Sequence, residues 1–175
     1  MIVDIQPLPH YFSSEHEDFR AALRDFVARE ITPNVNDWDE AGTFPRELYG
    51  RIAKLGVLGI GYDEAYGGTP ADIFYHLITS EELARSGGGG VAASLASHTI
   101  GLPPVASHGP EALKKRVIPP VLSGEKIAAL AVTEPGGGSD VASLKTTAIR
   151  DGDHYVVNGE KVFITSGMRA DFITV

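Results

Sequence analysis

Residues 131–140 read AVTEPGGGSD, and this stretch decides how the rest of the chain is interpreted. An apolar run ends at Val132, Pro135 cannot donate to a β-ladder, and three glycines allow close approach of the backbone to a neighbouring group. The bend therefore presents backbone N–H groups together with the hydroxyls of Thr133 and Ser139. Such a bend at the end of a strand suits a polar cofactor.

The chain before this bend is predicted to be α-helical. Ser14 and Glu17 fit a capping box, and apolar residues then recur at helical spacing until Pro33. These apolar residues are Phe19, Leu23, Phe26, Val27 and Ile31. Later helices are expected to begin at Pro45, at a cap between Thr69 and Asp72, at Val91 and at Pro110. Two adjacent prolines at residues 119–120 are expected to interrupt the last helix.

Short β-type runs replace the helical pattern from Ile127 onward. The expected strands are Ala128–Val132, Leu144–Arg150, His154–Asn158, Lys161–Thr165 and Phe172–Val175. The sequence thus predicts an α+β fold, with an all-α domain over residues 1–126 and the first strands of an antiparallel β-barrel-like middle domain over residues 127–175. Because the last run reaches the final residue, we expect the second domain to be truncated.

Composition excludes several classes of protein. The chain has 175 residues, 43% of them apolar, and a formal charge of −8 that argues against a nucleic-acid partner. It contains no cysteine, and its six histidines lack the spacing of a helical metal pair, so no metal site is expected. No apolar run is long enough to span a bilayer, and residues 1–11 resemble no targeting signal. A cytoplasmic location is therefore expected.

A second segment, Phe163 to Thr165, changes how the bend is interpreted. Seen alone, each segment is better explained as an ordinary strand end, and their co-occurrence reverses that preference. One cofactor that these two segments could bind together is a flavin. Its isoalloxazine ring gains negative charge near N1 on reduction, so the N–H and hydroxyl of Thr133 would favour the reduced form of the ring. In a strand, Phe163 and Thr165 would project from one face and Ile164 from the other.

Together the two segments resemble the flavin-contacting signature of the acyl-CoA dehydrogenases. The resemblance runs the length of the chain and covers somewhat under the first half of a typical member. Other residues that carry it are Phe44-Pro45, Tyr66-Gly67-Gly68, Gly109 through Lys114, Pro119 and Gly124-Glu125. It implies the N-terminal portion of an FAD-dependent enzyme that introduces an α,β double bond into an acyl-CoA thioester.

The resemblance also implies which residues meet the cofactor. These FAD-contacting residues are Leu130, Val132, Thr133, Gly138, Ser139, Phe163, Ile164 and Thr165. Ser139 would also reach the pantetheine of acyl-CoA or the diphosphate of FAD. Many members carry Trp at the position of Phe163. The catalytic glutamate of the family lies in a later helical domain, so we expect no catalytic residue and no turnover from these 175 residues.

Glu134 is expected in a turn or an ion pair, and not as a catalytic base. Residues 91–105 would help to line the acyl pocket, although His98, Thr99 and Ile100 are each expected in the core. The resemblance further implies an electron-transfer flavoprotein as acceptor and a homo-oligomer, either a tetramer or a dimer. Two alternatives stay open: an acyl-CoA oxidase or flavin monooxygenase of the same fold, and a non-catalytic helical interaction module.

Overall fold

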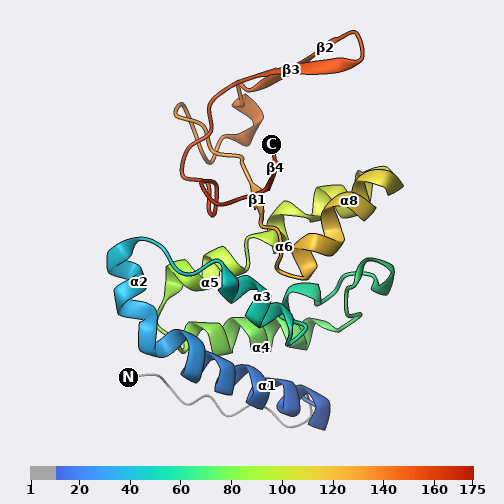
Figure 1. The fold of residues 1–175 in the computed structure, drawn as a ribbon. Helices are drawn as coiled ribbons and strands as arrows, with labels where there is room; N and C mark the ends of the chain where they lie inside the picture. The colour runs from blue at the N-terminus through green and yellow to red at the C-terminus, as the bar shows by residue number, and fades with distance from the viewer. Residues whose placement is uncertain (1–10) are drawn as a thin grey trace.

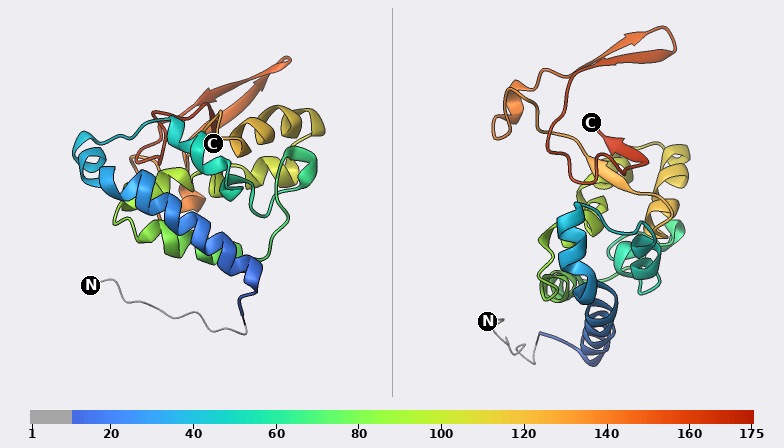
Figure 2. Two further views of the ribbon diagram at one scale, coloured as in Figure 1. Left: turned by 60° about the horizontal axis from the view of Figure 1, so that its bottom comes forward. Right: turned by 60° about the vertical axis from the view of Figure 1, so that its left-hand side comes forward.

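The computed structural model describes residues 11–175, so the interpretation of residues 1–10 as free of a targeting signal lies outside the described residues. The helices form one body, and the β segments extend from it at the carboxyl-terminal end (Figure 1). Two further views show one hairpin projecting away from the helices (Figure 2). The α+β class, with helices before strands, is confirmed.

Every helix expected from the sequence is present within residues 11–175. The α-helices are α1 (Ser14–Phe26), α2 (Val35–Ala41), α3 (Glu47–Ala53), α4 (Ile73–Ala84), α5 (Gly89–Leu95), α6 (His98–Gly101), α7 (Pro103–His108) and α8 (Glu111–Leu122). The strands are β1 (Ala128–Leu130), β2 (Thr147–Asp151), β3 (His154–Asn158) and β4 (Phe172–Thr174). The helix expected from Val91 is divided into α5 and α6, and neither α2 nor α7 was expected. In the described residues, no helix combines the length and apolar character needed to cross a bilayer.

The cap of α1 is one residue earlier than expected. The Ser13 hydroxyl accepts a hydrogen bond from the His16 backbone, and the Ser13 amide donates to Nδ1 of the His16 ring at 3.0 Å. The box therefore uses an imidazole in place of the carboxylate of Glu17. With Nδ1 acting as acceptor, Nε2 of His16 donates to Asp72, the cap of α4, at 3.1 Å. The start of α1 is thereby tied to the start of α4.

The prolines at residues 119–120 do not interrupt α8, which corrects the sequence-based expectation. The helix continues through them because its inner face is buried and because the amide of Ser123 still donates to the carbonyl of Pro119 at 3.0 Å. The buried residues of that face are Val117, Ile118, Val121 and Leu122. Together with Leu102 and Ala128 they form a cluster that joins the helices to β1.

The larger core lies between α1, α3, α4 and α5. Its fully buried side chains include Leu23, Ile31, Leu48, Ile52, Leu58 and Leu95. Burial of each such side chain contributes about 1.5–3 kcal/mol to folding. The core includes Ile127, the residue before β1, so it also fixes where the β segments begin.

The strands form two separate pairs. β1 pairs in parallel with β4, with Ala129 opposite Ile173, and β2 pairs with β3 as an antiparallel hairpin. The hairpin turns at Gly152, whose φ of 63° suits the Asp-Gly turn signal. Both faces of the hairpin are exposed.

The strand expected at Lys161–Thr165 is absent, and that prediction is wrong. Phe163 has a φ of 58° and Ser166 a φ of 63°, so both lie in the left-handed region, where an extended strand cannot continue. The segment is a turn. The expected alternation of Phe163 and Thr165 against Ile164 therefore has no strand to support it.

Candidate functional site

The glycine-rich bend closes as a tight turn. The amides of Glu134 and Gly137 each donate to the carbonyl of the other at 3.0 Å. A Cβ atom at Gly138 would lie 3.6 Å from Cγ2 of Thr133, so these two predicted cofactor residues are neighbours. Within residues 11–175 no acceptor bonds the amides of Thr133, Gly138 or Ser139. The bend thus offers free N–H donors beside the Thr133 hydroxyl.

Glu134 supports the bend from behind. Its side chain is buried, and its carboxylate accepts bonds from the Lys145 amide at 2.7 Å and from the amide and hydroxyl of Thr146 at 2.9 and 2.6 Å. Lys161 Nζ lies 2.9 Å from the same carboxylate. The Thr146 hydroxyl and Lys161 hold the pKa of Glu134 far below its ordinary value. The ion pair and turn role expected for Glu134 are thus present, and its carboxylate fixes the loop.

The two predicted cofactor segments lie against each other. The amide of Val162 donates to the Thr133 carbonyl at 3.0 Å, and Lys161 Nζ donates to the Val132 carbonyl at 2.9 Å. Lys161 thus holds the end of the first segment and the start of the second. This role of Lys161 was not predicted from the sequence, because its contact with Glu134 joins residues 27 positions apart.

The second segment presents its side chains to solvent. The Phe163 side chain is 94% exposed and Thr165 is exposed, whereas Ile164 is half-buried. The Phe163 ring therefore lies open to solvent. Among the remaining predicted residues, Leu130 pairs with Thr174 in the sheet, Val132 is half-buried, and Ser139 is exposed.

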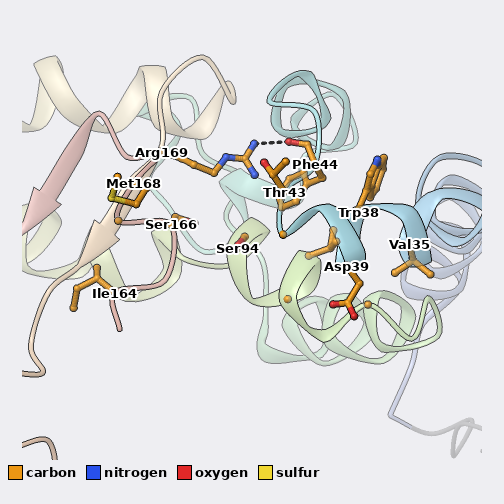
Figure 3. Close-up of a pocket in the computed structure, with 15 residues that line it drawn as sticks. Val35, Trp38, Asp39, Thr43, Phe44, Ser94, Ile164, Ser166, Met168 and Arg169 are labelled. Carbon is orange, nitrogen blue, oxygen red and sulfur yellow. Dashed lines mark hydrogen bonds between the residues drawn. The ribbon is translucent and has the colours of Figure 1, made fainter. Parts of the chain in front are cut away.

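A cavity of about 450 Å³ is lined by part of the second segment, the turn that follows it, and residues of α2 and α5. Figure 3 shows Ile164, Ser166 and Met168 on one side of it and Trp38 and Val35 on the other. Neither Thr133 nor Phe163 lines this cavity. Of the predicted cofactor residues, only Ile164 lines this cavity.

The α6 region is only partly core. His98 is buried, and its Nδ1 lies 3.1 Å from the Leu95 carbonyl, which can only accept, so Nδ1 carries the hydrogen. Burial lowers the pKa of His98 to about 4, and the Leu95 carbonyl opposes this only in part. The expectation that Thr99 and Ile100 are core is wrong, since both are exposed.

Comparison with known families decides the assignment. Residues 13–125 match the model for the N-terminal domain of acyl-CoA dehydrogenases, and residues 129–175 match the model for the middle domain. The chain belongs to the acyl-CoA dehydrogenase family. The family resemblance stated from residues 131–140 and 163–165 is thereby confirmed.

Individual relatives agree with this assignment. The chain is 41% identical over 164 residues to the mitochondrial long-chain specific acyl-CoA dehydrogenase of Sus scrofa, covering 94% of this chain and 38% of that protein. The structure of a putative acyl-CoA dehydrogenase from Mycobacterium smegmatis is 45% identical, has a TM-score of 0.90, and is matched over 94% of this chain and 44% of its own.

An acyl-CoA dehydrogenase from Bacillus anthracis, solved in complex with FAD, is 36% identical with a TM-score of 0.84, over 97% of this chain and 29% of its own. The chain thus spans between 29% and 44% of the length of these three relatives.

Proposed function

We propose that this acyl-CoA dehydrogenase family chain forms the N-terminal part of an FAD-dependent enzyme that introduces an α,β double bond into an acyl-CoA. The observation that supports this most is the pairing of the two cofactor segments through Val162, Thr133 and Lys161. In this proposal the Thr133 hydroxyl, the unbonded amides and the exposed Phe163 ring would together meet one flavin.

The residues of the two cofactor segments fit a flavin. Unbonded amides at Thr133, Gly138 and Ser139, within the described residues, match the carbonyl and diphosphate oxygens of FAD. Phe163 would cover the ring and Thr165 would meet its N5 edge, with Leu130, Val132 and Ile164 as apolar neighbours. Ser139 would also reach the pantetheine of the substrate. Bound FAD would supply the hydride acceptor; the chain's residues would bind it, orient it and stabilise its reduced form.

The proton-removing carboxylate is, in this proposal, not among these 175 residues. Glu134, next to the proposed face, is occupied by Lys145, Thr146 and Lys161 and is held ionised within the loop. These residues alone would therefore bind cofactor and substrate without dehydrogenating an acyl-CoA.

The wider assignments are proposals of the same kind. We place the boundary between the helical domain and the flavin-contacting domain at residues 126 and 127. An electron-transfer flavoprotein would accept the electrons, the enzyme would be a homotetramer or dimer serving lipid metabolism, and it would reside in the cytoplasm. These assignments rest on the family and on the expectations from the sequence.

The test is made on protein produced from the complete reading frame. We expect a visible flavin spectrum, bleaching on addition of a saturated acyl-CoA, and a more negative flavin reduction potential in Thr133→Val, because a donor to the reduced ring is lost. Thr147→Val, in the exposed strand β2, is the matched control and should leave the potential unchanged. A colourless protein, or one not reduced by any acyl-CoA, would contradict the proposed function.

A further inference from the structure

The turn at residues 163–170, which includes the second cofactor segment, has a strained backbone and is bonded to residues far away in the sequence. Phe163 and Ser166 both have a positive φ without being glycine, and such a residue costs on the order of 1–2 kcal/mol. Within the turn, the amides of Gly167 and Arg169 donate to the carbonyls of Ile164 and Ser166 at 2.9 Å. These local bonds do not reach the helical domain, so other contacts must fix the turn against it.

Arg46, the residue before α3, supplies contacts of that kind. Its Nη1 donates to the Arg169 carbonyl at 2.9 Å, across 123 positions of sequence. Its Nη2 forms an ion pair with Asp171 and lies 3.4 Å from the Glu125 carbonyl. One guanidinium therefore joins the end of the turn, the start of β4 and the segment before β1.

Asp171, the ion-pair partner of Arg46, is fixed by further contacts of its own. Its carboxylate accepts from the Ile127 amide at 2.9 Å, and Lys126 Nζ lies 3.4 Å away. Partial burial raises the pKa of Asp171, but the bonds from Ile127 and Arg46 outweigh it and lower the pKa below its ordinary value. The carboxylate that Arg46 grips is therefore ionised and fixed to β1 and β4.

Two reciprocal contacts run from the turn back to the helices. Arg169 donates to the Phe44 carbonyl at 2.8 Å, drawn as the dashed line in Figure 3, and its guanidinium lies 4.1 Å from the centre of the Phe44 ring. Tyr49 gives its proton to the Ser94 carbonyl at 3.0 Å, so the Ser166 hydroxyl, 3.3 Å away, donates to the Tyr49 oxygen. The strained Ser166 is thereby bonded to α3.

We propose that Arg46 is a positioning residue: through Arg169 and Asp171 it holds the turn at residues 163–170 in the strained form that aims Phe163 and Thr165 at the flavin. The inference rests on the proposed function for the flavin and on the hydrogen bonds for the turn. It assigns to the helical domain, through Arg46, a part in setting the chemistry of the flavin.

Three variants of the FAD-loaded protein test this, with two readouts. Arg46→Leu removes every hydrogen bond and the ion pair of the guanidinium. Arg46→Lys keeps the positive charge but loses the branched guanidinium that bonds several partners at once. Arg51→Leu is the control, because Arg51 lies on α3 and pairs with Glu30 instead. The first readout is hydrogen exchange at the amides of Gly167, Arg169 and Ala170. The second is the absorbance spectrum and reduction potential of the flavin.

We expect exchange at these three amides to be about tenfold to a hundredfold faster in Arg46→Leu, as befits loss of charge-assisted bonds. The absorbance spectrum and reduction potential of the flavin should also shift in Arg46→Leu. In Arg46→Lys the changes in exchange and in the flavin should both be smaller. In Arg51→Leu neither the exchange nor the flavin should change.

Unchanged exchange in Arg46→Leu would overturn the inference whatever the flavin does, as would faster exchange with an unshifted spectrum and potential. Wild-type protein without flavin would instead overturn the proposed function and the flavin part of this inference. If hydrogen exchange at the three amides were still faster in Arg46→Leu of that flavin-free protein, the result would support only the part of the inference in which Arg46 fixes the turn.

Discussion

At the scale of single residues, the hydrogen-bond partners of Glu134 indicate that it holds the loop in place and is not a catalytic base. A carboxylate beside a cofactor bend is a natural candidate base, yet four donors from Lys145, Thr146 and Lys161 surround it. The expectation of a turn or ion-pair role came from its place at a strand end. The structure adds what the sequence could not show: that the donors come from residues 11 to 27 positions away.

His98 makes stability depend on pH. Its pKa is about 4 in the folded chain and 6.5 when exposed, so the unfolded state binds the proton first as pH falls. Stability from neutral His98 is full above pH 6.5 and is lost as pH falls toward 4, by about 3 kcal/mol in total. Chemical unfolding of wild type and His98→Gln at several pH values measures this. The wild type should lose more stability across that interval.

His154→Gln provides the control, because His154 lies exposed on the hairpin. It should follow the wild-type curve. If His98→Gln and wild type lose stability in parallel between pH 6.5 and 4, His98 is not buried as a neutral ring.

At the scale of elements, α6 and β1 meet without space for a side chain between them. A Cβ atom at Gly101 would lie 2.9 Å from the backbone of Ala129, and the Gly101 carbonyl accepts from Thr174 in β4 at 2.7 Å. Gly101→Ala should therefore destabilise the chain by about 1–3 kcal/mol, through forced separation of α6 and β1. Chemical denaturation gives the value.

Gly90→Ala is the matched comparison in α5. Nothing lies within 4 Å of a Cβ atom there, and alanine favours a helix, so this variant should be neutral or more stable by up to about 1 kcal/mol. Equal effects of the two substitutions would show that α6 does not pack on β1 this closely.

Periodicity was a sound guide to the helices and a poor one to the second cofactor segment. The apolar spacing of Leu23, Phe26 and Ile31 reports burial that a helix produces by itself. Residues 161–165 have the composition of a strand, but they form part of a turn with positive φ at Phe163 and Ser166. The later residues of that turn, Ser166 and Arg169, are bonded to Tyr49 and Arg46, more than a hundred positions away. Contacts between residues so far apart leave no local pattern in the sequence. The same holds for α8, which continues through Pro119 and Pro120 because one of its faces is buried.

At the scale of the whole molecule, the helical body and the β segments meet through few but specific contacts. Ile127 sits in the helical core, and Arg46 and Arg169 exchange bonds across the junction. The hairpin β2–β3 extends beyond this junction (Figure 1). The arrangement leaves Gly136–Ser139 and the side chains of Phe163 and Thr165 exposed, next to segments that the sheet and the helical core hold in place. A proposed binding face is held most precisely when rigid elements support it in this way.

The most direct measurement is a structure of the protein, from its complete reading frame, with FAD bound. The account predicts Thr133 within about 3 Å of the pyrimidine edge of the isoalloxazine, with Thr165 at its N5 edge. Phe163 should lie over the same ring. FAD bound elsewhere, or a ring that only one of the two threonines contacts, would contradict the account.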